Sequence, residues 1–428
     1  MSLRRPNLRP RCLAGAGFSN LRLAVISPFV DKHHGTERVL AELLQQLAVE
    51  HGVDVNLYSQ CVADLAVSPA ESPSRSEGAG RILWRKVSSI PGPHLLQFIW
   101  WYFANRFARW RDKAFRGFVP ELVYSPGINA PDVDAITVHI VFHAFYEQVR
   151  PALRLRNNSP IHWPRTLHRT LYYRLIMALE RRIYKNPETA LSAVSGLVAA
   201  QLRLFFGRTD VLVVRNAVDT RYFNRQARLA RRDEARATLA IAQNEFVFLL
   251  VGNDWKKKGL DAALRALTEC LDLPVRLLIL GRDNREPFLQ LGEQLGLGAR
   301  LGFFESSRDV LQFYAAADAY LGPSLEDAYG LPILESMACG LPVIASCAAG
   351  ASEIIVDGEN GLLLRDPRDV KLLASLMRKI CVAPDQAAAL GAAAERTAAN
   401  ESWDIYAVRM LEHFRSIVSR KNISRPRQ

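Results

Sequence analysis

Two series of short apolar segments, each alternating with helical patterns, constrain this chain more than any other feature. The segments of the first series are residues 23–27, 53–58, 122–125, 135–140 and 190–194. Those of the second series are residues 246–251, 276–280, 319–321, 343–345 and 361–364. Apolar strands that alternate with helices form parallel sheets covered on both faces. The 428 residues also exceed what one core holds, which is roughly 250–300 residues. We therefore predict an α/β protein of two doubly wound, Rossmann-like domains that face each other across a cleft.

The charged, helix-prone stretch near residues 216–245 separates the two series and gives the domain boundary. We predict a flexible basic tail at residues 1–20, a first domain at 21–218 and a second domain at 219–401. Residues 402–428 form a terminal helix with an apolar stripe. We expect this helix to cross back to the first domain; the alternative is that it packs on the second.

The formal net charge of +12 is compatible with nucleic acid, an anionic membrane or a phosphorylated substrate. The chain has no zinc-finger, helix-turn-helix or RNP-type signature, so we predict no nucleic-acid partner. Its six cysteines form no C-x-x-C pair, which argues for reduced thiols, no metal site and a cytoplasmic compartment. The N-terminal arginines are followed by no apolar region, so we expect no secretory signal.

Ligands of open α/β sheets bind beyond the carboxyl ends of the strands, so the loops after strands are the places to search. The loop after residues 246–251 contains Asn253, Lys257 and Lys258 and leads into a helix that starts near Asp261. Lysines beside a helix N-terminus favour a phosphate group. The alternative is a solvated lysine run on a turn.

A second loop, residues 323–335, joins a strand to a helix through Gly330. The backbone amides of Gly330 and Leu331 would then lie at a helix N-terminus and form a second anion site. Asp327 and Glu335 could both point into the cleft, where a carboxylate suits a ribose diol or the hydroxyls of a sugar. The alternative is that Asp327 caps the helix and Glu335 complements its dipole.

Two further positions follow strands of the first series. Gly35 would let a ligand approach the backbone closely, and the chain has no G-x-G-x-x-G here, which disfavours a dinucleotide cofactor. The neighbouring His33 and His34 lack a partner set for a metal. His139 lies at a strand end that faces the predicted cleft, although a single histidine is more often structural than catalytic.

Taken together and in order, these motifs resemble the group 1, or family 4, retaining glycosyltransferases of GT-B fold. The matching pieces are Val194-Ser195, residues 216–219 with Phe223, residues 258–261, 280–281, 314–318, 323–324, 327–340 and 350–361. The resemblance extends from about Leu21 to Tyr406, and the segment 327–340 is its most specific part. The lysine-rich loop further resembles hexosyltransferases of the lipopolysaccharide core.

The resemblance implies that Glu335 binds the nucleoside ribose and that Lys258 neutralises the diphosphate of the donor. It places the backbone of Gly330 and Leu331 against the diphosphate or the donor sugar. It also places Gly35 near the donor phosphate.

His139 matches a strand-end histidine near the donor sugar, and with Asp327 it is our candidate catalytic residue. Asp327 stands where the family usually has glutamate, so Glu326 beside it is the alternative. Asn253 stands where the family often has arginine, which leaves Lys256 or Lys257 as the second positive charge.

These observations predict a metal-independent retaining hexosyltransferase. Its co-substrate is a nucleoside diphosphate sugar, and it needs no separate cofactor. The expected acceptor is a glycan or a lipid-linked sugar, and the lipopolysaccharide core is one candidate. The alternative is a catalytically degenerate protein of the same fold that binds a nucleotide or a glycan without turnover.

Basic and aromatic residues concentrate in the first half of the chain. Residues 145–185 carry nine Lys and Arg against two acidic residues, and residues 95–118 interleave arginines with tryptophan and phenylalanine. Such mixtures favour the interface of an anionic membrane. We expect peripheral contact through both stretches, on the inner face of the cytoplasmic membrane. The alternatives are a core helix with a solvated face and a surface for a phosphorylated acceptor.

Overall fold

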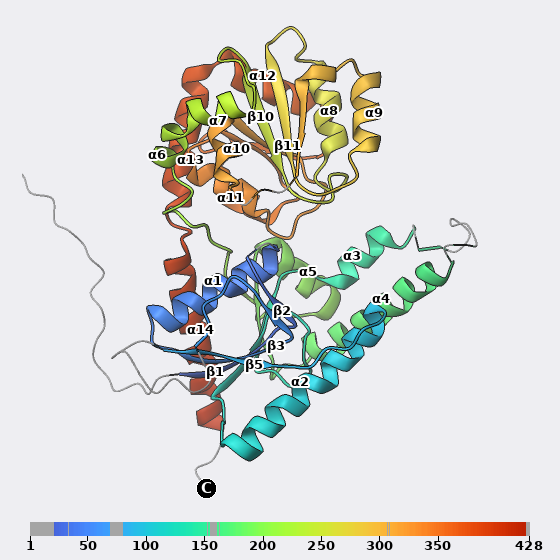
Figure 1. The fold of residues 1–428 in the computed structure, drawn as a ribbon, viewed down its shortest axis with the longest axis vertical. Coiled ribbons are helices and arrows are strands. Elements are labelled where there is room, and N and C mark those ends of the chain that lie inside the picture. The colour runs from blue at the N-terminus through green and yellow to red at the C-terminus, as the bar shows by residue number, and fades with distance from the viewer. Residues whose placement is uncertain are drawn as a thin grey trace, which may run out of the picture.

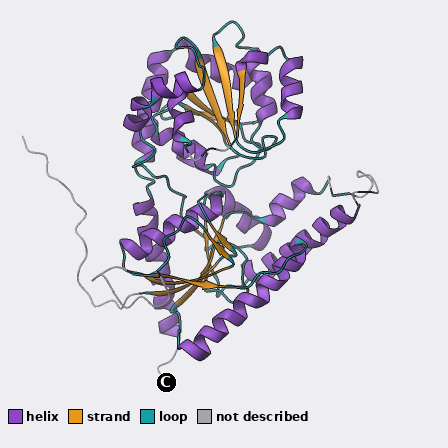
Figure 2. Ribbon diagram, viewed as in Figure 1, coloured by secondary structure: helices purple, strands orange, loops and turns teal. Residues whose placement is uncertain are grey.

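The computed structural model describes residues 21–32, 34–68, 80–151, 153–154, 161, 163–305, 307 and 309–424. The tail predicted at residues 1–20 and His33 lie outside the described residues. The described chain forms two α/β units, one above the other in Figure 1, with helices on both faces of each sheet (Figure 2). The predicted fold class is confirmed.

The first sheet consists, within the described residues, of parallel strands in the order β5-β3-β1-β6-β7-β8-β9. Their bounds are β1 Arg22–Ile26, β3 Asp54–Ser59, β5 Ile82–Lys86, β6 Leu122–Ser125, β7 Ala135–Val138, β8 Ala190–Ala193 and β9 Leu212–Val213. A short pair, β2 (Phe29–Val30) with β4 (Cys61–Val62), lies outside this sheet. The predicted strands are confirmed, and β5 and β9 were missed.

Five helices accompany the first sheet in the described residues. They are α1 Gly35–Val49, α2 His94–Arg116, α3 Phe142–Val149, α4 Trp163–Tyr184 and α5 Gly196–Phe206. α1 is helical because Val39, Leu40, Leu43, Leu44 and Leu47 recur at helical spacing, and all five are buried. α2 and α4 contact each other and project beyond the sheet (Figure 1). In the described residues, none of the helices combines the length and apolarity needed to cross a membrane.

The second sheet has the order β12-β11-β10-β13-β14-β15, with every neighbouring pair parallel. The strands are β10 Phe246–Val251, β11 Val275–Leu280, β12 Leu301–Phe304, β13 Ala319–Gly322, β14 Val343–Ser346 and β15 Leu362–Leu364. The order reverses between β10 and β13, and in such sheets this switch point is where ligands bind. The loops that carry Lys258 and Asp327 follow these two strands.

The helices of the second unit begin with the segment that links the two sheets. They are α6 Arg225–Ala230, α7 Arg232–Thr238, α8 Leu260–Thr268, α9 Glu286–Gln294, α10 Leu311–Ala316, α11 Leu331–Ala338, α12 Val370–Val382 and α13 Pro384–Ala398, with a 3-10 turn at Gly350–Ile354. The start of α8 lies beside the residue that follows β13. Gly259 is so close to the carbonyl oxygen of Pro323 that a Cβ at position 259 would lie 2.0 Å from that oxygen. This close approach requires glycine and joins the two switch-point loops.

The last helix, α14 (Trp403–Ser424), packs on the first unit. Tyr406, Met410 and Phe414 are buried in the same apolar cluster as the leucines of α1 and β3. The rings of Tyr124 in β6 and Phe414 lie 5.0 Å apart. In Figure 1 this helix, drawn in red, runs down from the second unit along the side of the first.

Candidate active site

A cavity of about 430 Å³ lies between the two sheets, where their strand ends face each other. It brings together all predicted site residues except Lys257, namely Gly35, His139, Asn253, Lys258, Asp327, Gly330, Leu331 and Glu335. Lys257 lines a neighbouring cavity together with Glu326. Segments far apart in the sequence therefore meet at one site, as expected for ligands at the carboxyl ends of parallel strands.

Two helices begin at this cavity. α1 starts at Gly35 and α11 starts at Leu331, and neither N-cap residue, His34 or Gly330, supplies a side-chain capping hydrogen bond. Gly330 precedes α11 with φ of 88°, and a Cβ there would lie 3.2 Å from Oδ2 of Asp327, so this turn favours glycine. The N-termini of two helices, with their positive dipole ends, therefore meet at the same cavity, which suits an anion.

Lys258 adds a positive charge to this anion site. Its Nζ forms an ion pair with Oδ2 of Asp327, and both side chains are largely buried. The loop after β10 thus supplies the cation and the loop after β13 supplies the carboxylate. Asp327 is held in turn by its backbone N–H, which donates to the carbonyl of Ala348 at 3.0 Å.

Glu335, in α11, lines the cavity and is otherwise buried. Its Oε1 accepts a hydrogen bond from Nη1 of Arg38 at 2.8 Å, and its Oε2 accepts one from the hydroxyl of Tyr314 at 2.6 Å. Each carboxylate oxygen has two lone pairs, so a position remains on each oxygen for a further donor such as a ribose hydroxyl. The arginine comes from α1 of the first unit, so this ion pair spans the two units.

His139 follows β7 directly and lies with part of its surface exposed to the cavity. The protein around it disfavours the charged ring and lowers its pKa to about 4. The imidazole is therefore neutral near pH 7, where it can donate and accept one hydrogen bond each.

Asn253 and Lys257 have partners that sequence reasoning did not anticipate. Oδ1 of Asn253 accepts the backbone N–H of Arg282 at 2.7 Å, which ties the loop after β10 to the loop after β11. Nζ of Lys257 lies 4.2 Å from the ring centroid of Phe145 in α3, a cation–π contact between the two units. Lys257 therefore lines the neighbouring cavity, because its side chain extends toward Phe145, and its part in donor binding stays a prediction.

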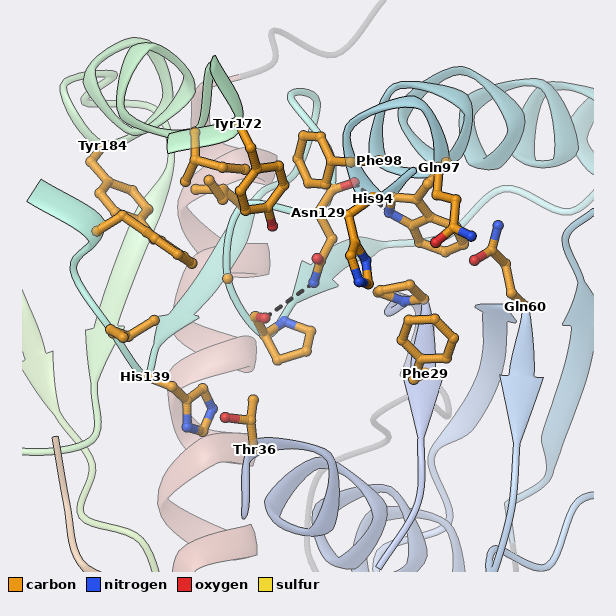
Figure 3. A pocket seen from close by; sticks show the side chains of 18 residues that line it. Phe29, Thr36, Gln60, His94, Gln97, Phe98, Asn129, His139, Tyr172 and Tyr184 are labelled. Atoms are coloured by element: carbon orange, nitrogen blue, oxygen red, sulfur yellow. Dashed lines mark hydrogen bonds between the residues drawn. The ribbon is translucent and has the colours of Figure 1, made fainter. Parts of the chain in front are cut away.

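A second cavity, of about 260 Å³, opens in the first unit under α2 and α4 (Figure 3). It lies at the switch point of the first sheet, where residues 126–129 follow β6. His139 and Thr36 line both this cavity and the one between the units. In Figure 3 these two side chains lie next to each other at one end of the cavity. The two cavities therefore meet at His139 and Thr36.

Sequence reasoning missed this second cavity, two residues that line the cavity between the units, Arg38 and Thr36, and Tyr314, which donates to Glu335. Arg38 could have been found from the sequence, because it is a charged residue near the start of the apolar helix that begins at Gly35. Tyr314 belongs to residues 314–318, which are part of the family resemblance but suggested no role for this tyrosine. The aromatic residues of α2 were assigned to a membrane surface, although Phe98 and Trp101 line the cavity.

Several contacts hold the units together beside the site. The hydroxyl of Ser195 donates to the carbonyl of Ala328 at 2.8 Å. The backbone N–H groups of Gly196 and Leu197, at the start of α5, donate to the carboxylate of Glu353 at 2.9 and 2.8 Å. In the described residues, no group of three or more His, Cys, Asp and Glu side chains is arranged to hold a metal ion.

Comparisons with known proteins agree with this architecture. Residues 231–397 match the family model described as glycosyl transferases group 1. The D-inositol 3-phosphate glycosyltransferase of Rhodococcus erythropolis (strain PR4 / NBRC 100887) is 33% identical over 196 residues, 43% of this chain and 44% of that protein. The lipopolysaccharide glucosyltransferase WaaG of Escherichia coli (strain K12) is 32% identical over 142 residues, 32% of this chain and 38% of that protein. The chain thus spans less than half the length of these curated relatives.

Solved structures extend the likeness to the whole fold. The crystal structure of WaaG superposes with a TM-score of 0.71 at 20% identity, covering 92% of this chain and 99% of that one. Anabaena Alr3699/HepE in complex with UDP and glucose superposes with a TM-score of 0.63 at 17% identity, covering 93% and 100%. The fold is therefore GT-B, and most of the second domain, residues 231–397, matches the group 1 glycosyl transferases.

Proposed function

We propose that this chain is a retaining glycosyltransferase that moves a hexose from a nucleoside diphosphate sugar to a glycan or a lipid-linked acceptor. One observation carries the proposal. Two helix N-termini, whose N-cap residues supply no side-chain cap, meet Lys258 and Glu335 around one cavity between two Rossmann-like units. This arrangement offers an anion site beside a buried carboxylate, which is what a nucleoside diphosphate requires.

In this proposal the ribose binds Glu335, whose oxygens keep free lone pairs beside Arg38 and Tyr314. The diphosphate lies against the amides of Gly330 and Leu331 and near Lys258. The anionic leaving group is then matched by positive charges that are in place before the reaction. HepE, solved with UDP-glucose, has the same fold and supports a donor of this class.

Cleavage of the bond between the anomeric carbon and the diphosphate oxygen makes the sugar ring positive and the diphosphate more negative. Lys258 and the two helix N-termini stabilise the second charge, a preorganised arrangement of the kind that supplies much of enzymatic rate enhancement. These groups are sufficient for the charge that develops, so we propose a metal-independent reaction. Activity that persists unchanged in EDTA would support this point, and activity restored only by a divalent cation would contradict it.

Retention is proposed from the resemblance to family 4 enzymes. The acceptor oxygen forms its bond to the anomeric carbon on the face from which the diphosphate leaves. The proton of the acceptor hydroxyl passes to an oxygen of the departing phosphate, so no carboxylate of the enzyme needs to form a covalent intermediate. His139 is neutral and lies where the two cavities meet, which suits a hydrogen bond to the transferred sugar.

In this proposal the protein binds to a membrane surface and takes its acceptor from there. α2 and α4 project together from the first unit and expose large apolar side chains such as Phe103, Phe107 and Trp163. Exposed arginines and lysines lie among them, as on surfaces that bind anionic membranes. We propose peripheral binding to the inner face of the cytoplasmic membrane, with the lipopolysaccharide core as one candidate acceptor because WaaG is a relative. Of the second stretch, residues 152, 155–160 and 162 lie outside the described part of the chain.

A donor panel tests the proposal. We expect one or more of UDP-, GDP- and ADP-hexoses to raise the melting temperature, because a ligand that binds the folded state stabilises it. Glu335→Gln keeps one acceptor oxygen, for Arg38, and replaces the other by an NH2 group that can donate to the Tyr314 hydroxyl. Because the charge is lost, donor affinity should fall about tenfold or more, the worth of a charged hydrogen bond. The exposed Glu359→Gln serves as the matched control and should leave donor binding unchanged.

Transfer to an acceptor then separates an active enzyme from the degenerate alternative. Donor binding together with sugar release or transfer supports the proposal. Donor binding without either reaction would favour the degenerate protein. A panel in which every donor leaves the melting temperature unchanged would contradict both.

A further inference from the structure

The cavity under α2 and α4 differs from the one between the units in its charge. Among the described residues that line it there is no Asp, Glu, Lys or Arg. We propose that the part of the acceptor that enters this cavity is an uncharged sugar, and that phosphorylated or carboxylated sugars are excluded. The inference rests on the proposed function and specifies the substrate class of its acceptor site.

Aromatic rings form much of the cavity wall. Phe98 and Tyr172 are packed edge to face at 6.0 Å, and Phe29 exposes about half of its surface (51%). The ring of Trp101 is fixed by a hydrogen bond from its Nε1 to the carbonyl of Asn129 at 3.0 Å. Figure 3 shows Phe29, Phe98 and Tyr172 around the hollow. Rings of this kind present large rigid faces that the apolar C–H face of a pyranose can cover.

Amide side chains supply the polar part of the wall. Gln60, Gln97 and Asn129 line the cavity, and Figure 3 shows the first two with their amide groups near each other. Nδ2 of Asn129 donates to Oγ of Ser125 and to the carbonyl of Pro126, which holds this amide in place. An amide both donates and accepts hydrogen bonds, as a sugar hydroxyl does. A mostly apolar wall with a few oriented polar groups is the usual form of a site for a neutral ligand.

An anion in this cavity would meet no Lys or Arg side chain among the described lining residues, whose basic groups are the imidazoles of His94 and His139. Lys258 is paired with Asp327 in the other cavity, and Lys257 lies against Phe145. His139 remains neutral near pH 7, because burial lowers its pKa to about 4. Removing a phosphate from water without a partner is costly, so the wall selects against it.

The position of the cavity also fits an acceptor. It meets the proposed donor site at Thr36 and His139, so a hydroxyl at that end of a bound sugar faces the donor. Two sites of different electrostatic character thus meet at one point, one for a diphosphate and one for a neutral group.

The inference is tested by binding to the full chain, measured by saturation-transfer NMR. The neutral probes are methyl glucoside, methyl galactoside and methyl mannoside, and the charged probe is glucose 6-phosphate. We expect saturable binding of at least one neutral glycoside and binding of the phosphate that is about tenfold weaker or less. Phe98→Ala should weaken the neutral probe about fivefold, whereas Phe103→Ala, on the exposed face of the same helix, should not.

Gln97→Lys provides a second readout that does not depend on removing part of the core. It introduces a cation at the cavity wall and should raise binding of glucose 6-phosphate. Equal or tighter binding of the phosphate by the natural chain would overturn the inference, as would the failure of all three neutral glycosides to bind. UDP-glucose binding, measured in parallel, reports on the donor site alone, so failure of the proposed function is seen separately.

Discussion

Each predicted carboxylate of the cavity between the units has a cationic partner. Asp327 is paired with Lys258, and Glu335 is paired with Arg38. Such pairs fix the direction of each carboxylate. At this scale the site is therefore preorganised, and single substitutions that remove a charge are the sharpest probes.

Asp327 and Glu326 can be distinguished by neutral substitutions. Asp327 lines the cavity with Lys258, whereas Glu326 lines only the neighbouring one in the pockets described. We expect Asp327→Asn to lower kcat/KM about tenfold to a hundredfold, because a charged hydrogen bond contributes about 1.5–3 kcal/mol. Glu326→Gln should change it less than about twofold. Steady-state kinetics measure both, and a larger loss in Glu326→Gln would reverse the assignment.

His139 makes stability depend on pH. Its pKa is about 4 in the folded chain, against about 6.5 when unfolded. Between pH 6.5 and 4 His139 binds a proton in the unfolded chain but not in the folded chain. The free energy of unfolding therefore falls as pH drops through this range. The slope from this group is at most about 1.4 kcal/mol per pH unit.

His139→Gln should flatten that slope in urea unfolding between pH 6.5 and 4. His413, whose pKa is also lowered to about 4, remains in the variant and preserves part of the dependence. Identical pH profiles for the two chains would show that His139 does not titrate in this way.

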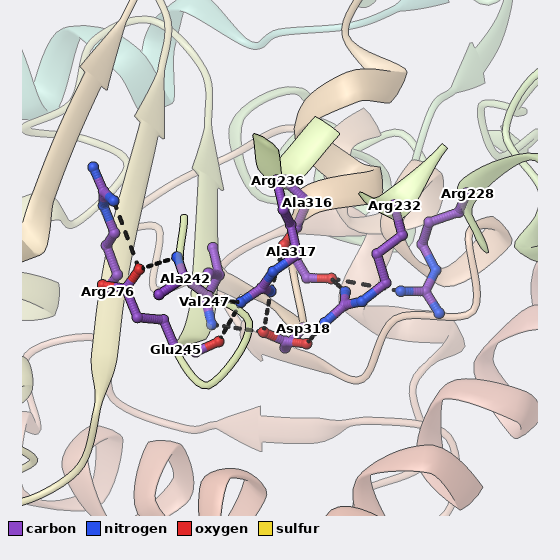
Figure 4. Close-up of polar contacts among 10 residues, drawn as sticks. All are labelled: Arg228, Arg232, Arg236, Ala242, Glu245, Val247, Arg276, Ala316, Ala317 and Asp318. Atoms are coloured by element: carbon purple, nitrogen blue, oxygen red, sulfur yellow. Dashed lines mark hydrogen bonds and ion pairs between the residues drawn. The ribbon is translucent and has the colours of Figure 1, made fainter. Parts of the chain in front are cut away.

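At the scale of elements, the segment between the sheets is attached to the second unit by arginines of α6 and α7 (Figure 4). Arg236 is fully buried and donates to Asp318 and to the carbonyls of Ala316, Ala242 and Glu245. Arg232 pairs with the other oxygen of Asp318. The charged residues of this stretch, which predicted a domain boundary, therefore pack the linking segment against the second unit.

The exposed face of α2 is the second feature at this scale, and vesicle binding tests it. Phe103 and Phe107 expose 69% and 60% of their surfaces. Replacing both by serine should weaken binding to anionic vesicles tenfold or more, since burial of each ring contributes about 1.5–3 kcal/mol at most. The control is Leu204→Ser, an equally exposed apolar residue on α5.

Co-sedimentation with vesicles at low and high salt measures this effect. The natural chain should bind less as salt rises, because charge contributes to the attraction. Failure of the natural chain to co-sediment with anionic vesicles at low salt would contradict membrane contact through α2.

At the scale of the whole molecule, the two units are joined by more than the linking segment. α14 leaves the second unit and completes the core of the first, while Glu353 caps α5 across the boundary. The first unit thus depends on residues at the far end of the chain. The two units meet around the proposed donor site, so their relative position determines its geometry.

Phe414→Ala tests that dependence. Phe414 is fully buried against the first unit, so its truncation should lower the free energy of unfolding by about 3–5 kcal/mol. Val408→Ala, on an exposed face of the same helix, should cost less than about 0.5 kcal/mol. Urea unfolding measures both, and equal effects would mean that α14 does not contribute to the core of the first unit.

In the described residues the prediction of elements succeeded for the inner strands of both sheets and failed at three edge strands, β5, β9 and β12. β10 and β11 are buried runs whose composition indicates a parallel sheet. β5 ends in Trp84, Arg85 and Lys86 at the edge of its sheet, so its sequence lacks that signal. Edge strands need no second buried face, and their pattern is correspondingly weak.

Local sequence determined the sheets, the loops that follow their strands and the glycine turn before α11, because strand periodicity and turn chemistry act over a few residues. It thereby brought Lys258, Gly330 and Glu335 to the candidate site. Only the tertiary structure paired Glu335 with Arg38, 297 positions away, and directed Lys257 to Phe145. These contacts join the two units, and the relative placement of two separately folded cores is decided by their packing, which no local pattern records.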